Sequence, residues 1–185
     1  VLDAPINYKM LYQKLVYLSE KNGAQFLLGA NLVPEGKESN KASITIGKSS
    51  EKIEVTADYF VYTSGYNSKE ILAKYFPNTV ELRLWKNHSL IFPRFTHNGF
   101  FSIEPGLPSV MPQGSYSIVC QSQEDTLMEK PNFEVNTTTT DGIFQSLVNV
   151  MPSVEKYRNV YKPVACMKPD VISSQDHSRS VNVEI

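Results

Sequence analysis

The sequence predicts an α+β or mixed α/β fold, in which one or more βα units precede a largely antiparallel sheet with one long helix packed on it. Three features support this class. Residues 57–63 combine aromatic and β-branched side chains, as buried strands do, and a glycine turn and a helix cap follow at Gly65 and Asn67. After residue 80, apolar and polar residues alternate, as in strands with one buried face. One long segment with an apolar face, about residues 140–150, comes later.

The first expected element is a helix over about residues 8–22, which Asn7 can cap. Gly23 is the expected stop, because glycine readily adopts the backbone angles that end a helix. Three leucines recur at helical spacing and form one apolar stripe, which we interpret as core packing: Leu11, Leu15 and Leu18.

Short strands are expected next. Residues 25–28 indicate a strand that Gly29 ends. Residues 43–46 and 52–55 alternate on either side of the segment 47–50, which contains a glycine and two serines. This pattern predicts a β-hairpin.

A βα unit follows, with a strand at residues 57–63, a turn at Gly65 and a helix over residues 68–75. Pro77 ends the helix. In α/β proteins, ligand sites form where strands of this kind end. The alternative is an ordinary βα unit that binds nothing.

The pattern after residue 80 predicts antiparallel strands joined by turns. Residues 80–85 form one expected strand and residues 89–96 a second. The pair Asn98-Gly99 is typical of a tight hairpin turn and leads to a further strand at residues 100–103.

Residues 105–114 are rich in proline and glycine, so we expect a loop there, followed by a strand at residues 115–121. Thr140 or Asp141 can cap the long helix, and the last strand is expected at residues 159–168. One face of the long helix is apolar: Ile143, Phe144, Leu147 and Val148.

These elements predict an α/β part at residues 1–78, an antiparallel part at residues 79–170 and a polar tail at residues 171–185. The formal net charge is −1 and basic residues are not clustered, which argues against nucleic-acid binding through phosphates. No apolar stretch reaches the roughly 20 residues of a membrane-spanning helix. We expect a cytoplasmic protein that acts on a small molecule, with Cys120 and Cys166 reduced, although a disulfide between them stays open.

Known catalytic and cofactor motifs are largely absent from the sequence. There is no G-x-G-x-x-G dinucleotide fingerprint and no G-x-S-x-G nucleophile elbow. His88, His97 and His177 are not at metal-ligand spacing, and no Cys-x-x-Cys occurs, so no metal is expected.

The order of three segments resembles the D-amino-acid-oxidase-like family of FAD-dependent oxidoreductases. The first, residues 8–29, contains Tyr-x-x-Leu-x-x-x-Leu and then Gly-Ala-Gln-Phe. The second, residues 57–68, reads Ala-Asp-Tyr-Phe-Val-Tyr-Thr-Ser-Gly-Tyr-Asn-Ser. The third, residues 161–169, ends in Lys-Pro, where the family usually has Arg-Pro.

This resemblance implies FAD as the cofactor. Leu32 would lie beside the adenine, and the backbone at Thr63, Ser64 and Gly65 would approach the cofactor. The family's amino-terminal G-x-G-x-x-G unit is missing, so we expect FAD binding only if the full-length protein carries that unit. The chain alone is expected not to hold FAD tightly and to be inactive.

For the substrate, the resemblance implies that Lys168 meets an anion over the flavin, with Lys162 as a second basic residue. By the two-residue period of a strand, Lys162, Val164, Cys166 and Lys168 share one face. The alternative is that Lys168 simply ends its strand in solvent. Lysine lacks the planar fork of arginine, so a carboxylate should bind more weakly than in the family.

Two functions remain open at this point. The first is the substrate-binding portion of an FAD-dependent oxidoreductase that oxidises a small molecule bearing an amine or hydroxyl group. The second is a non-enzymatic ligand-binding or protein-interaction domain that has lost cofactor binding. A G-x-G-x-x-G unit encoded upstream of Val1 would favour the enzyme.

Overall fold

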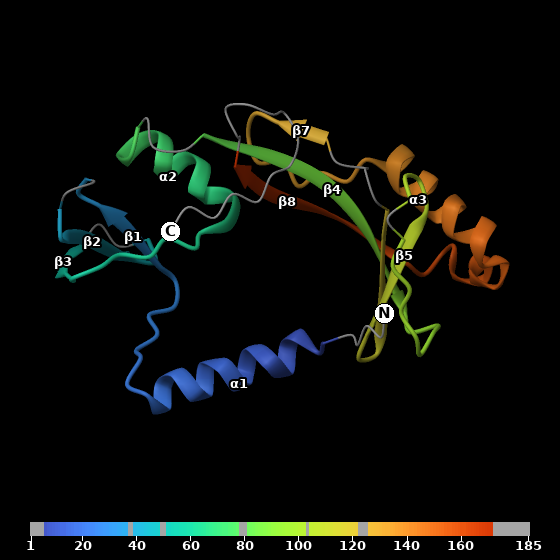
Figure 1. Ribbon diagram of the computed structural model, residues 1–185, viewed down its shortest axis with the longest axis horizontal. Coiled ribbons are helices and arrows are strands. Elements are labelled where there is room, and N and C mark those ends of the chain that lie inside the picture. Colours follow the sequence, from blue (N-terminus) through green and yellow to red (C-terminus); the bar gives the residue numbers. More distant parts are fainter. Residues whose placement is uncertain are drawn as a thin grey trace. The chain divides into compact units, whose positions relative to one another are not determined.

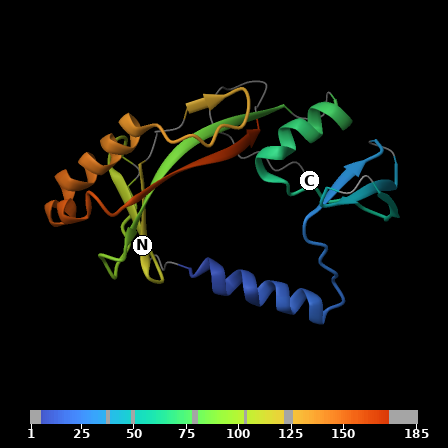
Figure 2. The same cartoon turned by 180° about the vertical axis from the view of Figure 1, so that it is seen from behind.

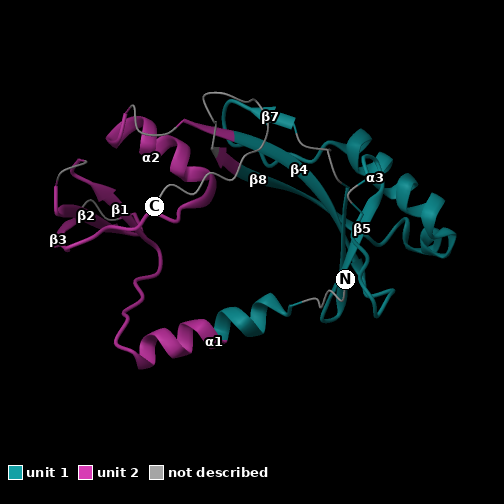
Figure 3. Cartoon of the chain, viewed as in Figure 1, with its two compact units in different colours: residues 1–13, 84–168 teal, residues 14–83, 169–185 magenta. Residues whose placement is uncertain are grey.

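The computed structural model describes residues 6–36, 39–48, 51–77, 81–102, 104–121 and 126–171. The chain divides into two compact units (Figure 3). Unit 1 comprises residues 1–13 and 84–168, and unit 2 comprises residues 14–83 and 169–185. The boundary expected between residues 78 and 79 and the tail expected from residue 171 stay predictions, and most of that tail lies outside the described residues.

Unit 2 holds a three-stranded antiparallel sheet of order β1-β2-β3 and a short helical segment. Its elements and the preceding helix, which spans the boundary between the units, are α1 (Tyr8–Lys21), β1 (Ala30–Pro34), β2 (Lys41–Ile46), β3 (Lys52–Thr56), the 3-10 helix η1 (Gly65–Asn67) and α2 (Ser68–Tyr75).

Unit 1 is built on a five-stranded antiparallel sheet (Figure 1). The order is β5-β6-β4-β7, and β8 also pairs with β4. Its elements are β4 (Leu82–Pro93), β5 (Pro108–Gln113), β6 (Tyr116–Gln121), β7 (Thr126–Met128), α3 (Thr137–Val150), the 3-10 helix η2 (Pro152–Tyr157) and β8 (Lys162–Val171). The predicted antiparallel sheet is therefore confirmed.

Both ends of α1 follow the sequence signals. Asn7 Oδ1 accepts a hydrogen bond from the Met10 backbone N–H at 3.1 Å, as an N-cap does. Gly23 has a φ of +89° and lies within paired backbone hydrogen bonds that close the helix. The core interpretation of the leucine stripe is wrong, because the exposed fractions of its members lie between 40% and 52%: Leu11, Leu15 and Leu18.

The hairpin of β2 and β3 is confirmed, with Ile44 opposite Ile53 and Gly47 at a φ of +59° in the turn. The short strand expected at residues 25–28 is wrong, because these residues have no strand structure. The strand instead begins after Gly29, which has a φ of +69° and accepts a hydrogen bond from the Gly47 N–H at 2.9 Å.

The buried strand expected at residues 57–63 is also wrong. This segment has no strand structure, and Tyr59 and Val61 are 88% and 82% exposed. Aromatic and β-branched residues favour a strand only when a neighbouring strand supplies hydrogen bonds and packing, and none of the described strands pairs here. The turn expected at Gly65 and the helix expected over residues 68–75 are confirmed, since Gly65 has a φ of +59° and α2 spans Ser68–Tyr75.

The two strands expected at residues 80–85 and 89–96 are joined in one continuous strand, β4, over Leu82–Pro93, and residue 80 lies outside the described residues. Residues 86–88, between the two expected strands, are polar, but Lys86 and His88 are buried and have partners. Lys86 Nζ donates to Asn132 Oδ1 at 2.9 Å, and His88 Nε2 accepts from the Asn136 backbone N–H at 3.1 Å. These bonds compensate the burial of the polar groups and let the strand continue.

The loop expected at residues 105–114 is wrong over its second half, which forms β5. Pro108 is the first residue of β5, and β5 is the last strand in the sheet order, which are the places where a sheet tolerates proline. The hairpin expected at Asn98-Gly99 does not form. Phe100 instead makes an isolated bridge with Val110 of β5.

The long helix packs on the sheet as predicted, and Figure 2 shows it lying against the strands from behind. It begins earlier than expected, because Asn136 is the N-cap and its side chain accepts from the Thr139 N–H at 3.1 Å. The buried core joins the helix, η2 and three strands: Leu90, Phe92, Val110, Val119, Ile143, Phe144, Leu147 and Val154.

Candidate functional site: the second face of the antiparallel sheet

The sheet of unit 1 has two unlike faces. The α3 face carries Leu90 and Phe92 of β4 with Val119 of β6, all fully buried against the helix. The second face carries the residues between them. Ser89 lies opposite Cys120 and Ile91 lies opposite Ile118, and directly opposed residues of antiparallel strands share a face.

Most side chains that β4 and β6 place on the second face are half-buried, whereas those on the α3 face are buried. In β4, the burial alternates except at Asn87, with Leu84 and Leu90 buried and Trp85, Ser89 and Ile91 intermediate. The surface is therefore partly apolar and partly accessible. Antiparallel sheets commonly pack one face on the core and leave the other to solvent.

One polar cluster on this face joins β6 and β8. Burial raises the pKa of the Cys120 thiol, the ammonium of Lys168 lowers it, and Cys166 raises it further. The net shift is upward, so the thiol stays protonated at neutral pH. These electrostatic interactions indicate that Lys168 and Cys166 lie near Cys120. Strand alternation predicts that Lys168 and Cys166 share one face of β8.

Both cysteines are free thiols and half-buried, as expected from the sequence. Cys120 lies on β6 and Cys166 on β8, and each of these strands pairs with β4. The disulfide that the sequence left open is therefore not formed in this structure.

Lys162 and Lys168 are six positions apart along β8. An extended strand covers that spacing in roughly 20 Å. Both side chains are exposed, and one small carboxylate can contact only one of them. Lys168 is the one beside the thiols, and it also makes further interactions.

A buried side-chain amide lies on β4, the strand that pairs with both β6 and β8. Asn87 of β4 is only 7% exposed, and its Oδ1 has no hydrogen-bond partner among the described residues. An unpaired buried acceptor of this kind costs about 1–3 kcal/mol of folding free energy. From the sequence, Cys120 is expected only as a reduced thiol and Asn87 is not singled out, because the surroundings of each depend on strands that are distant in the chain.

The residues expected to bind the cofactor lie in unit 2. Leu32 is on β1 opposite Ile44 and is 36% exposed. Thr63 is exposed, and Ser64 Oγ shares a hydrogen bond with Ser68 Oγ at 3.0 Å. A Cβ placed on Gly65 would meet nothing within 4 Å, so the glycine is needed for its positive φ and the backbone there is open to an approaching group.

These residues account for part of an FAD site at most. The open backbone at Gly65 fits a close approach, and the sequence has no glycine-rich loop that could hold a pyrophosphate. Beside this segment, the Tyr62 hydroxyl is buried with no partner among the described residues, and burial raises its pKa.

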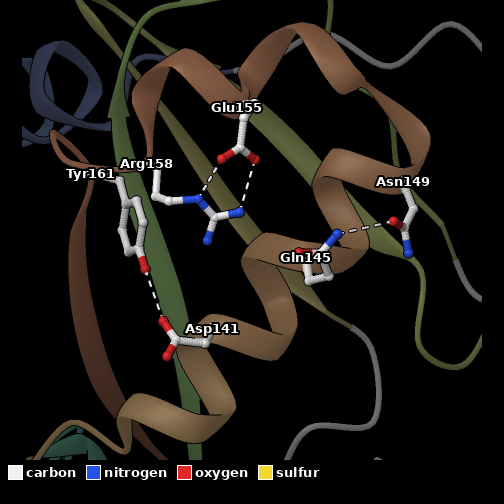
Figure 4. A network of polar contacts seen from close by, with 6 residues as sticks. All are labelled: Asp141, Gln145, Asn149, Glu155, Arg158 and Tyr161. Atoms are coloured by element: carbon white, nitrogen blue, oxygen red, sulfur yellow. Dashed lines mark hydrogen bonds and ion pairs between the residues drawn. The ribbon is translucent and has the colours of Figure 1, made fainter.

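Polar and aromatic contacts connect α3 with the segment after η2, which leads into β8 (Figure 4). Arg158 pairs with Glu155, with its Nη2 donating to Oε2 at 2.8 Å, and its guanidinium lies 4.5 Å from the centre of the Phe144 ring. Tyr161 stacks on Phe144, and its hydroxyl donates to Asp141 at 3.3 Å. These contacts lie on the α3 face, so they support the sheet and leave its second face free for a ligand.

Metal and membrane sites are not found in the described part of the chain. No group of three or more histidine, cysteine or acidic residues there could hold a metal ion. Among the described residues, no helix has the length and apolar character needed to cross a bilayer.

Comparison with known proteins identifies a fold. No family model and no curated protein matches the sequence. Among solved structures, glycine oxidase from Geobacillus kaustophilus is similar, with a TM-score of 0.62 at 11% sequence identity. The match covers 87% of this chain and 42% of the glycine oxidase chain, so this chain spans less than half the length of that enzyme. The chain thus shares the fold of part of a glycine oxidase, in agreement with the resemblance found in the sequence.

Proposed function

We propose that this chain contributes the substrate-binding portion of an FAD-dependent oxidoreductase, and that its substrate is a small acid bearing an amine or hydroxyl group. The observation that carries the proposal is the second face of the sheet, which is partly accessible and has Lys168 beside two thiols. The fold likeness to glycine oxidase supports the enzyme class.

In this proposal, the flavin supplies the redox chemistry when it is bound, and the chain's own residues bind and orient the substrate. Lys168 attracts the carboxylate as a point charge. Ile91 and Ile118 of the second face provide apolar contact for the carbon skeleton. Leu32, Thr63, Ser64 and Gly65 are the residues proposed to meet the cofactor.

Lysine variants test the anion site. We expect Lys168→Met to weaken binding of propionate to the purified chain about five- to tenfold, since a partly exposed ion pair contributes about 1 kcal/mol. Lys168→Arg should keep or strengthen binding. Lys162→Met is the matched control, because it removes the same charge from the far end of the same strand, and it should leave the affinity unchanged.

Equal losses in both methionine variants, or no loss in either, would contradict the assignment of Lys168.

A flavin titration tests the cofactor part of the proposal. The chain alone should show no saturable submicromolar binding of FAD, because the sequence lacks a pyrophosphate-binding loop. In a flavin-loaded full-length protein, Lys168→Met should raise the KM for an acidic substrate and leave kcat largely intact.

A second candidate is a non-enzymatic domain that binds small acids. The missing dinucleotide fingerprint favours it. The same lysine variants would then alter propionate binding, while a full-length protein would show no flavin absorbance.

A further inference from the structure

Asn87 breaks the burial pattern of β4. By strand alternation it lies on the second face with Trp85, Ser89 and Ile91. Those three neighbours are half-buried, whereas Asn87 is 7% exposed. It is therefore an enclosed polar side chain between half-buried neighbours on the same face of β4.

Asn87 also differs from the polar residues on either side of it in its hydrogen bonding. Lys86 and His88 lie on the α3 face, and each is buried with a hydrogen-bond partner at 2.9 Å and 3.1 Å, respectively. Asn87 Oδ1 has none among the described residues. A buried acceptor without a donor destabilises the fold, so the stability of the sheet gives no reason for an asparagine here.

The surroundings of Asn87 point to a ligand. Ser89 is two residues away on the same strand face, about 7 Å along the strand. Ser89 lies opposite Cys120, and the Cys120 thiol interacts with the ammonium of Lys168. The sheet thus offers a positive charge near Cys120 and, on the strand that pairs with β6, an unused hydrogen-bond acceptor.

We propose that Asn87 is a ligand-binding residue, whose Oδ1 accepts a hydrogen bond from the hydroxyl or amine of an acid held by Lys168. This inference rests on the proposed function, because it takes the carboxylate site from it. The hydrogen bond to Asn87 would make the site selective among small acids. An acid with a donor next to its carboxylate satisfies Asn87, and an acid without one leaves the amide oxygen unpaired.

A pair of matched acids tests the proposal. Lactate and propionate have the same carboxylate and similar size, and they differ by one hydroxyl donor. We expect the purified chain to bind lactate about five- to tenfold more tightly than propionate in an NMR titration. In Asn87→Leu, which has a similar shape and no polar atoms, the two affinities should become equal through loss of lactate binding alone.

Asn87→Leu should also raise the melting temperature of the free chain by about 2–4 °C, since it removes an unpaired buried group. A purely structural asparagine would instead give a lower melting temperature. Asn87→Ala is the second variant, and it should also abolish the preference for lactate. Ser89→Ala is the control, because it changes a neighbour on the same face and should keep the preference.

The outcomes separate this inference from the proposed function. Loss of both acids in Lys168→Met supports the anion site, whatever Asn87 does. If the wild type shows no preference for lactate, or if Asn87→Leu keeps that preference or lowers the melting temperature, the role of Asn87 is overturned. If Lys168→Met leaves both affinities unchanged while Asn87→Leu removes the preference, the lysine assignment fails and Asn87 stands as a binding residue.

Discussion

The two units differ in where their apolar side chains lie. All eight residues of the hydrophobic core cluster belong to unit 1, between its sheet, α3 and η2. In unit 2, the helix α2 has no buried residue, and large apolar side chains such as Leu28 and Tyr59 are more than four-fifths exposed. Unit 1 is therefore held by packing, whereas the sheet of unit 2 is held mainly by its backbone ladder.

This difference shows that the apolar composition of a segment does not by itself determine whether the segment is buried. Residues 57–63 have the composition of a buried strand and lie exposed. The polar centre of β4 has the composition of a turn and lies buried. In both cases, the presence or absence of a neighbouring element decides the outcome.

The largest expected effect is in the core of unit 1. Phe144→Ala removes a fully buried ring that stacks with Phe92 and Tyr161, and it should lower the free energy of unfolding by about 3–5 kcal/mol. Leu32→Ala in unit 2 should lower it by less than about 1 kcal/mol, because that side chain is partly exposed. Urea denaturation measures both. Equal losses of unfolding free energy in the two variants would contradict the conclusion that packing stabilises unit 1 more than unit 2.

A smaller effect is expected at the start of α3. Asn136→Ala removes the side chain that accepts from the Thr139 N–H, and it should destabilise unit 1 by about 1 kcal/mol. Asn136→Ser should recover most of the loss, since serine is also a good N-cap. A thermal melt of the three proteins checks this. A loss in Asn136→Ala that serine does not recover would mean that the cap is not the cause.

The mildest change concerns the second face. Burial raises the pKa of the Cys120 thiol, and Lys168 opposes this shift. Removing the charge in Lys168→Met should raise that pKa further, so the pH at which Cys120 reacts half-maximally with iodoacetamide should move upward. Cys166→Ser leaves Cys120 as the remaining cysteine and simplifies the measurement. A pH midpoint of the iodoacetamide reaction that stays constant or moves downward would contradict an electrostatic interaction between Lys168 and Cys120.

Local signals in the sequence predicted local structure well in both units. Asn7 as a cap, Gly23 as a stop, Gly47 in a hairpin and Gly65 before α2 all act through residues within a turn of themselves. The apolar face of α3 was found for the same reason, because helical spacing lies within one segment.

Pairing between distant segments could not be predicted in the same way. β5 carries two prolines that favour a loop locally, and it forms a strand because β6 pairs with it along its length. The cluster of Cys120 with Lys168 likewise depends on two strands that both pair with β4. Strand alternation predicted the face of Lys168, but only the fold brings that face beside β6.

The central claim is that ligands bind on the second face of the antiparallel sheet in unit 1. Three isoleucine δ1 methyl groups report on it directly, because Ile91 and Ile118 lie on the second face and Ile143 lies on the α3 face. We predict that lactate, titrated into methyl-labelled chain, shifts the signals of Ile91 and Ile118 in a saturable way and leaves Ile143 unchanged. Shifts confined to Ile143, or no saturable shift at Ile91 and Ile118, would contradict the claim.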